Sequence, residues 1–329
     1  MGETKKVLMT LNFSSDLINN FDGLVKDFES KGFEVTLVPS YSRDQRDEMI
    51  AALQGKYAFV LVGENMTREV LEACPDLKIL SRMGAGYDEV DVAAATDLGI
   101  AVTVTPGANA PAVAEHALGL MLASTRQIAL LDKKTRAGVW GVEFGIGVFG
   151  KTLGLVGMGA VGKLLAKYVS GFEMRVLAYD PYPDEAFAKA NNIELVSLEE
   201  LLRESDFISL HCPYMESTHN IIGREQIAMM KANVQIINCA RGKLIDEAAL
   251  YEAIVAGKVA GAGLDCWEHE PVNMDNPLLT HDRVVATSHT AGMTYEVRKI
   301  VVETAFANVV DIAGGELPRG LINPDAIKK

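Results

Sequence analysis

The sequence predicts an α/β protein made of two doubly wound domains, each built on a parallel sheet. At 329 residues the chain is long enough for two domains of ordinary size. Short apolar runs alternate with segments of helical periodicity in both halves, the pattern that βαβ units leave in a sequence. A glycine-rich turn typical of nucleotide binding begins near the middle of the chain, so a domain of roughly 100 residues is expected before it.

The first half contains five apolar runs that we interpret as parallel strands. Residues 15–31 carry apolar side chains at helical spacing and predict a helix between the first two strands. The breaker cluster Thr105-Pro106-Gly107 follows the fifth strand. An apolar helix over residues 110–126 comes next, and the glycine- and aromatic-rich residues 138–150 are expected to cover the domain surface. The five strands are expected at residues 6–11, 34–38, 59–62, 78–81 and 101–104.

The second half repeats this architecture without repeating the sequence. Near residue 293 the pattern changes to a single helix over residues 294–313, which we expect to return to the first domain. We therefore predict a substrate (catalytic) domain of residues 1–105 plus 294–329, and a nucleotide-binding domain of residues 106–293. The strands of the second domain are expected at residues 153–156, 175–179, 207–210, 235–238, 261–264 and 284–286.

The strongest motif is a G-x-G-x-x-G turn between the first two strands of the second half. Gly157 permits the tight turn, Gly159 lets the backbone approach a pyrophosphate, and Gly162 lets the helix pack on the strand. The helix then presents free N–H groups to the phosphates. Asp180 follows 18 residues after Gly162, where a carboxylate holds a ribose 2′-OH and repels a 2′-phosphate. The three glycines alone also fit an ordinary turn, but this context predicts NAD binding.

Three polar side chains follow strands of the second half, at the edge where parallel sheets bind ligands. Arg241 follows the strand at 235–238, Glu270 the strand at 261–264, and His289 the strand at 284–286. Hydride transfer to a 2-oxo acid needs a cation for the substrate carboxylate and a general acid for the forming alkoxide. A carboxylate beside a histidine favours its charged form. The three side chains can supply these three functions.

Each of these side chains also has a purely structural interpretation. Arg241 fits a strand cap or an ion pair with Asp246, Glu270 a solvated loop acid, and His289 a turn histidine. Their joint occurrence after three strands of one sheet favours the catalytic interpretation. His116, in the helix over residues 110–126, is interpreted as a helix residue at a domain or subunit contact.

Composition and charge narrow the class of protein. The formal net charge of −13 argues against a general nucleic-acid or anionic-membrane surface. No segment approaches the roughly 20 apolar residues of a membrane helix, and the first residues lack a signal-peptide pattern. The four cysteines lack metal-ligand spacing, so we expect reduced thiols in a cytoplasmic protein and predict no metal site. They are Cys74, Cys212, Cys239 and Cys266.

Several segments in the right order resemble the D-isomer-specific 2-hydroxyacid dehydrogenases, and within them the phosphoglycerate dehydrogenase-like members. The resemblance covers most of the chain and implies one Rossmann NAD-binding domain and one flavodoxin-like substrate domain. The segments are SRMGAGYDEVD (81–91), TPGANAPAVAEHALGLML (105–122), GLVGMGAVG (154–162), HCPYMESTHNII (211–222), NCARGKLIDEAAL (238–250), GAGLDCWEHEP (261–271) and SHTAG (288–292).

This resemblance implies roles for individual residues. Arg241 would bind the 2-oxo acid, His289 would be the acid/base, and Glu270 would raise the pKa of His289. The helix over residues 110–126 resembles the family's dimer element, so a homodimer is expected. The backbone of Met83, Gly84 and Ala85, in a first-domain loop, would bind the substrate carboxylate. The polar side chain of Asn109 would lie nearby. The cofactor would contact Met158, Gly159, Ala160, Val161 and Gly162 at its pyrophosphate, Pro213 and Thr218 at adenosine, and Cys239 and Asp265 at nicotinamide.

One departure from the family bears on the substrate. Longer phosphoglycerate dehydrogenases resemble one another in carrying an arginine that approaches the substrate phosphate, whereas the matching segment VGENMT (62–67) offers Glu64 and no cation. The sequence therefore leaves open 3-phosphoglycerate in serine biosynthesis, hydroxypyruvate, glyoxylate, and longer 2-oxo acids. It also leaves open an NAD(H)-sensing binding protein and a formate or phosphonate dehydrogenase on the same plan.

Overall fold

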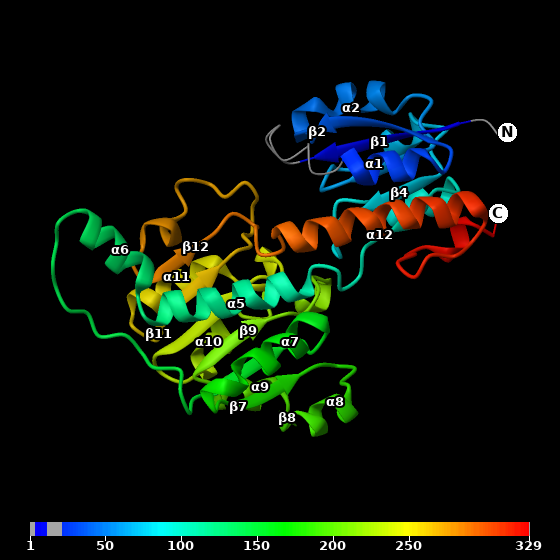
Figure 1. Cartoon of the computed structure of the whole chain (residues 1–329). Coiled ribbons are helices and arrows are strands. Elements are labelled where there is room, and N and C mark those ends of the chain that lie inside the picture. The colour runs from blue at the N-terminus through cyan, green and yellow to red at the C-terminus, as the bar shows by residue number, and fades with distance from the viewer. Residues whose placement is uncertain (1–3, 12–21, 329) are drawn as a thin grey trace. The chain divides into compact units, whose positions relative to one another are not determined.

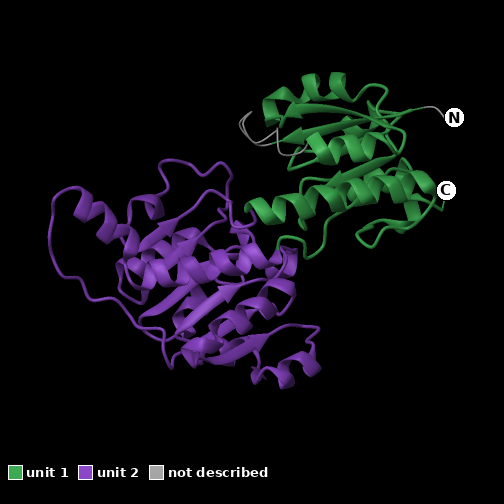
Figure 2. Ribbon diagram, in the orientation of Figure 1, with its two compact units in different colours: residues 1–109, 294–329 green, residues 110–293 purple. Residues whose placement is uncertain are grey.

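The computed structural model describes residues 4–11 and 22–328 of the chain and divides into two compact units. Unit 1 comprises residues 1–109 and 294–329, and unit 2 comprises residues 110–293 (Figure 2). Each unit is an α/β layered structure on its own parallel sheet.

Within the described residues, unit 1 contains a sheet of five parallel strands in the order β2-β1-β3-β4-β5 (Figure 1). This is the flavodoxin-like strand order, with helices on both faces of the sheet. It confirms the predicted fold class for this unit. The strands are β1 (Lys5–Leu11), β2 (Phe33–Pro39), β3 (Ala58–Leu61), β4 (Ile79–Arg82) and β5 (Ala101–Thr103).

The two faces of this sheet are covered by helices from both ends of the chain. One face packs on α2 (Arg46–Leu53), α3 (Arg68–Glu72) and α4 (Val92–Asp97) through a core that includes Leu8 and Phe59. On the other, the Phe28 ring of α1 (Asp22–Glu29) stacks on the Phe306 ring of α12 (Tyr295–Gly314), with centroids 4.2 Å apart. The helix predicted over residues 15–31 is seen only as α1, because residues 12–21 lie outside the described part.

The long helix α12 is fixed to the sheet of unit 1 by two buried hydrogen bonds. The Ser81 hydroxyl donates to the Ala305 carbonyl oxygen at 2.9 Å, and the Asn308 side-chain amide donates to the Val104 carbonyl oxygen at 3.0 Å. The polar groups involved are buried, so each bond removes the cost of an unpaired donor or acceptor.

In the described residues, unit 2 contains a sheet of seven parallel strands in the order β12-β11-β10-β9-β6-β7-β8. Counted from β6, this is the Rossmann order 3-2-1-4-5-6 with one more strand at the edge. The strand β8 was not predicted, since of its residues only Ile193 is buried. The strands are β6 (Thr152–Val156), β7 (Arg175–Tyr179), β8 (Ile193–Leu195), β9 (Phe207–Leu210), β10 (Val234–Asn238), β11 (Val259–Leu264) and β12 (Val284–Ala286).

Successive side chains along these strands point to opposite faces of the sheet, so each face has its own hydrophobic core. Leu153 and Leu155 of β6 pack with α5 and α7, whereas Val156 packs with α9, α10 and α11. Both faces are apolar, as expected for a parallel sheet buried between helices. The helices are α5 (Ala110–Thr125), α6 (Ile128–Arg136), which was not predicted, α7 (Ala160–Tyr168), α8 (Glu185–Ala190), α9 (Leu198–Glu204), α10 (Arg224–Met229) and α11 (Glu247–Val255).

The segment after α6 was expected to cover the domain surface. It forms a long loop (Figure 1), in which Ile146 and Val148 pack on the core of unit 2 and most of the other apolar side chains are exposed. Trp140 is 92% exposed and Phe144 is 91% exposed. Further exposed apolar side chains of this loop are Val139, Val142 and Phe149.

Across the described ranges 4–11 and 22–328, no helix has the length and apolar character that crossing a membrane requires.

Candidate active site

The glycine turn lies between β6 and α7, at the point where the strand order of unit 2 reverses. Gly157 has φ +99°, and a Cβ there would meet the backbone N of Cys212 at 2.6 Å. A Cβ on Gly162 would meet the Gly157 carbonyl oxygen at 2.4 Å. Gly159, which precedes α7, faces open space. Two glycines therefore hold the turn closed and the third leaves room for a ligand at a helix N-terminus, as a pyrophosphate site requires.

Asp180, after β7, is tied to this turn. Its Oδ2 accepts from the Met158 N–H at 2.8 Å, and its Oδ1 accepts from the Tyr182 N–H at 2.9 Å. The carboxylate remains partly exposed, and each oxygen has a second lone pair. It can therefore hold the turn in place and still accept a hydrogen bond from a ribose hydroxyl.

The loop after β9 lies beside the glycine turn, since β6 and β9 are neighbours in the sheet. The Thr218 hydroxyl donates to the Pro213 carbonyl oxygen at 2.9 Å and accepts from the Met215 N–H at 2.8 Å. The loop that carries the two predicted adenosine-side residues is therefore closed on itself. At its start, burial lowers the pKa of His211 to about 4, so this imidazole is neutral.

Arg241 is positioned by the turn after β10. The buried Asn238 side chain donates to the Arg241 carbonyl oxygen at 2.8 Å and accepts from the Ala240 N–H at 3.0 Å. The Arg241 guanidinium donates through Nη1 to the Ala240 carbonyl oxygen at 2.7 Å. The next residue, Gly242, packs directly on the loop after β11, where a Cβ would lie 1.8 Å from the Trp267 carbonyl carbon. This contact brings the Arg241 turn against the loop that carries Glu270.

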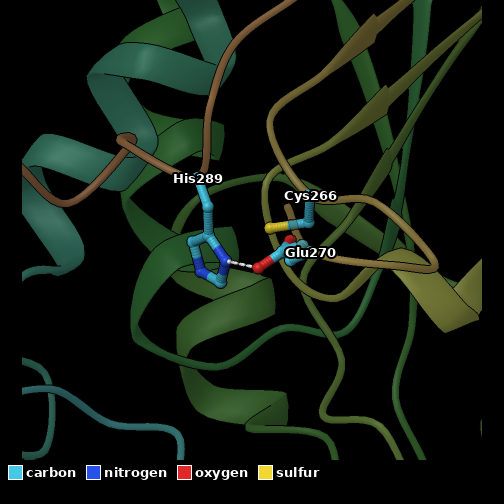
Figure 3. Close-up of side chains that lie close together, drawn as sticks. All are labelled: Cys266, Glu270 and His289. Atoms are coloured by element: carbon cyan, nitrogen blue, oxygen red, sulfur yellow. Dashed lines mark hydrogen bonds and ion pairs between the residues drawn. The ribbon is translucent and has the colours of Figure 1, made fainter. Parts of the chain in front are cut away.

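Glu270 and His289 form a hydrogen-bonded pair. The Nδ1 atom of His289 lies 2.6 Å from Oε2 of Glu270 (Figure 3), and Oε1 of Glu270 accepts from the Trp267 N–H at 3.0 Å. Because both carboxylate oxygens are engaged, the carboxylate and the imidazole have fixed orientations. The other ring nitrogen, Nε2, is then available for a substrate.

Each partner changes the pKa of the other. Hydrogen bonds with the Cys266 sulfur and with Glu270 raise the pKa of His289 to about 10, although burial opposes the shift. Burial works to raise the pKa of Glu270, but the hydrogen bond and charge of His289, with the charge of Arg241, hold it below its usual value. At neutral pH the pair is therefore an imidazolium beside a carboxylate, the state of a proton donor.

The loop that carries His289 is held by the buried carboxylate of Asp265. Oδ1 accepts from the Thr287 hydroxyl at 2.6 Å and from the Thr290 N–H at 2.9 Å, and Oδ2 accepts from the Ala291 N–H at 2.9 Å. The His289 N–H donates to the Asp265 carbonyl oxygen at 2.7 Å. These bonds support His289 in the left-handed region, at φ +52°. The predicted contact of Asp265 with nicotinamide stays a prediction, since the contacts described here are with the loop.

Two contributors to this edge of the sheet were missed by the sequence analysis. Thr287 is contacted by His116, whose Nε2 lies 3.1 Å from the hydroxyl oxygen. Cys266 is buried, with its sulfur 3.4 Å from the Ala240 carbonyl oxygen. Both follow strand ends by one or two residues, and this position was the signal that could have found them. Cys239, which was predicted to contact nicotinamide, is buried at the end of β10, and burial raises the pKa of its thiol.

The predicted substrate loop of unit 1 follows β4. The Met83 N–H donates to the Leu61 carbonyl oxygen at 2.8 Å, and the Gly84 N–H donates to the Arg82 carbonyl oxygen at 3.0 Å. Gly84, at φ +147°, is buried, whereas Ala85 is exposed. Asn109 lies half-buried in the turn before α5.

Glu64, the acid of the VGENMT segment, is buried at the end of β3 with 2% exposure. Its Oε2 accepts from the Val62 N–H at 3.0 Å and from the Gly63 N–H at 3.1 Å. Two adjacent N–H groups at a strand end form an anion-binding nest. Here the chain's own carboxylate fills it.

A Rossmann sheet that carries a dinucleotide turn and a histidine–carboxylate pair at the same carboxyl edge is typical of a nicotinamide-dependent dehydrogenase. Residues 118–291 match the NAD-binding domain of the D-isomer specific 2-hydroxyacid dehydrogenase family. The chain belongs to this family and is an NAD-dependent D-2-hydroxyacid dehydrogenase by class, which confirms the resemblance and the predicted cofactor.

Relatives with assigned activities differ in substrate and in length. A glyoxylate reductase of Korarchaeum cryptofilum is 41% identical over 274 residues, 82% of this chain and 82% of the relative. A D-3-phosphoglycerate dehydrogenase of Methanocaldococcus jannaschii is 41% identical over 305 residues, 91% of this chain but 57% of the relative. The chain thus spans little more than half of the second relative. The solved NAD-dependent formate dehydrogenase of Staphylococcus aureus in complex with NAD matches with TM-score 0.85 and 26% identity, over 96% of this chain and 98% of that chain.

Proposed function

We propose that the chain reduces small, unphosphorylated 2-oxo acids of the hydroxypyruvate and glyoxylate class to D-2-hydroxy acids with NADH. The observation that carries this proposal is the 2.6 Å pair of His289 and Glu270, held beside the Arg241 turn. In this pair His289 donates its Nε2 proton to the forming alkoxide, and Glu270 stabilises the imidazolium. Arg241 holds the substrate carboxylate and polarises the carbonyl with its planar fork.

The chain has the cradle that NAD needs. Gly159 leaves open space before α7, and Asp180 presents a partly exposed carboxylate to a ribose. When bound, the cofactor supplies the hydride. The proposed contacts are Gly157 through Gly162, including Met158, Ala160 and Val161, with Asp180, Pro213, Thr218, Cys239 and Asp265. In unit 1, Met83, Gly84, Ala85 and Asn109 are proposed to bind the substrate. Ala85 is the best placed for the carboxylate, because it is exposed and the N–H groups of Met83 and Gly84 are already hydrogen bonded.

The preference for an unphosphorylated substrate rests on Glu64. Its carboxylate occupies the nest formed by the Val62 and Gly63 N–H groups, so a phosphate cannot use them without expelling a buried side chain. A buried negative charge at this strand end also repels a dianion. A short uncharged side chain on the substrate meets neither obstacle.

A second candidate is the oxidation of 3-phosphoglycerate, the first step of serine biosynthesis. Arg82 favours it, because this cation ends β4 directly before the substrate loop and donates to the Met83 carbonyl oxygen at 2.6 Å. A rotation of the Arg82 side chain would let its guanidinium pair with the substrate phosphate. Arg82 would then substitute for the arginine that VGENMT lacks.

The test is NADH oxidation against hydroxypyruvate, glyoxylate, pyruvate and phosphohydroxypyruvate. We expect hydroxypyruvate or glyoxylate to give the highest kcat/KM. A preference for phosphohydroxypyruvate would overturn the substrate class and support the serine pathway. His289→Ala should retain NADH binding, followed by fluorescence, while turnover falls roughly 10²–10⁴-fold. NADH binding without turnover on any acid in the wild type would favour an NAD(H)-sensing protein.

We further propose a cytoplasmic homodimer. The four cysteines are free thiols, which suits a reducing compartment. The apolar composition of α5, from which a dimer was expected, is accounted for by packing against α7, β10 and β11 within unit 2. The exposed side chains of residues 139–149 support a partner subunit more directly, because monomers rarely leave such a set in water.

A further inference from the structure

Three ligating side chains of different chemistry converge at the carboxyl edge of the unit 2 sheet. Figure 3 shows Cys266 and Glu270, from the loop after β11, pointing toward His289, from the loop after β12. One ligand atom from each, the Sγ, a carboxylate oxygen and an imidazole nitrogen, lie within 4.8 Å of one another. The His289–Glu270 contact is explained by proton transfer, but a thiol at the same point is not.

We propose that these three side chains form an inhibitory site for a thiophilic divalent cation, with Zn²⁺ as the ligand and Cd²⁺ as its spectroscopic analogue. Thiolate, imidazole and carboxylate are the three donor types that proteins use for Zn²⁺, and three such donors leave a fourth position for water. The inhibition rests on the proposed role of His289 as proton donor, whereas the binding of the ion does not.

The geometry needs small side-chain adjustments. With Zn²⁺ bonds of about 2.0–2.3 Å, tetrahedral ligand atoms lie roughly 3.3–3.6 Å apart. Nδ1 of His289 and Oε2 of Glu270, now at 2.6 Å, must therefore separate slightly, and both must move closer to the Cys266 sulfur. The His289 and Glu270 side chains are 44% and 37% exposed, so the ion can reach them from solvent, and both can rotate once the ion replaces the hydrogen bond between them. Cys266, which is buried, supplies the fixed ligand.

Binding releases protons and involves no redox step. The Cys266 thiol loses its proton and forms a metal–sulfur bond, and the proton between Nδ1 and Oε2 is replaced by the ion. Burial raises the pKa of the Cys266 thiol, so the thiolate forms with the ion present rather than before it. Once Nδ1 and Glu270 are both ligands, His289 can no longer exist as an imidazolium stabilised by Glu270. The bound ion therefore removes the proton donor, and a chelator restores it.

The first test uses the full chain, reduced and freed of metals with a chelator, and titrated with Cd²⁺ while the ultraviolet cadmium–thiolate charge-transfer band is recorded. We expect one ion per chain in the wild type. Cys266→Ser, which keeps a donor for the Ala240 carbonyl oxygen, should lose the band. A second variant, Cys266→Ala, should lose it too. Cys74→Ala, which removes a buried thiol in unit 1, should keep it. An unchanged band in both Cys266 variants, or no band in the wild type, would overturn the site.

The second test is Zn²⁺ inhibition of 2-oxo acid reduction at neutral pH. Half-inhibition should need at least about tenfold more Zn²⁺ in Cys266→Ser than in the wild type, a loss typical of an altered metal site. Equal inhibition of both proteins would contradict the proposal. A cadmium band in the wild type without inhibition would instead refute the role of His289 as proton donor and leave the metal site standing.

Discussion

The imidazole of His116 lies 3.1 Å from the hydroxyl oxygen of Thr287, and that hydroxyl lies 2.6 Å from the Asp265 carboxylate. The single Thr287 proton is donated to Asp265, so we infer that Nε2 of His116 carries a proton and donates it to Thr287. A chain of hydrogen bonds thus runs from α5 to the carboxylate that holds the His289 loop.

His116 is therefore expected to be a positioning residue. His116→Ala should lower kcat about fivefold to tenfold, the effect of about 1 kcal/mol from one hydrogen bond, with little change in KM. His116→Gln, which keeps a donor, should recover most of the loss. In a double-mutant cycle with Thr287→Val the two effects should not add. Additive losses, or no recovery by glutamine, would show that His116 serves only packing.

The pH profile tests the His289–Glu270 pair. Reduction requires protonated His289, so its rate should stay high as pH rises and fall only near pH 10, the raised pKa of this group. Glu270→Gln removes a charge that stabilises the imidazolium, so the fall should move toward the ordinary value of 6.5. Oxidation requires neutral His289, and its rise with pH should move in the same direction. The measurement is kcat/KM against pH in both directions, and an unshifted profile in the variant would contradict the pairing.

The cofactor preference should depend on Asp180. Asp180→Asn keeps an acceptor for one of the two loop amides but removes the charge that repels a 2′-phosphate. We expect NADH to bind more weakly and the NADPH/NADH ratio of kcat/KM to rise by about tenfold or more, the equivalent of 1.4 kcal/mol. An unchanged ratio would mean that Asp180 only shapes the glycine turn.

Gly242 should be sensitive to a single methyl group. A Cβ in Gly242→Ala would lie 1.8 Å from the Trp267 carbonyl carbon and 2.4 Å from the Glu268 nitrogen, both backbone atoms. The loops of Arg241 and Glu270 must then separate, which should cost about 1–3 kcal/mol of unfolding free energy and most of the activity. Gly171→Ala, where a Cβ meets nothing within 4 Å, is the matched control and should change neither. Denaturant unfolding and turnover check both variants.

The exposed loop after α6 should set the oligomeric state. In Trp140→Asp/Phe144→Asp two nearly fully exposed apolar side chains become charged, which penalises their burial against a partner. Light scattering should find the wild type as a dimer and the variant as a monomer. A dimer of unchanged stability in the variant would place the interface elsewhere.

The sheets could be predicted from the sequence because parallel strands are short apolar runs. The strands before Arg241 and Glu270 are buried runs of this kind, and the strand before His289 is an apolar run that is only partly buried. The strand β8 escaped prediction because Glu194 and Leu195 are exposed and leave no such run. Contacts between loops could not be predicted from the sequence. The burial of Glu64 against its own backbone depends on a turn whose shape no periodicity encodes, and the approach of Cys266 to His289 depends on the packing of two loops.

The buried carboxylate of Asp265 protects backbone amides of the loop around His289, as pairing protects the amides of a strand inside a sheet. The Thr290 and Ala291 amides donate to a fully buried acceptor, so they should exchange with deuterium as slowly as strand amides rather than as fast as loop amides. Slow exchange in the free enzyme would mean that His289 is held in its catalytic position before the substrate binds. Substrate binding would then lose no conformational entropy by ordering this loop.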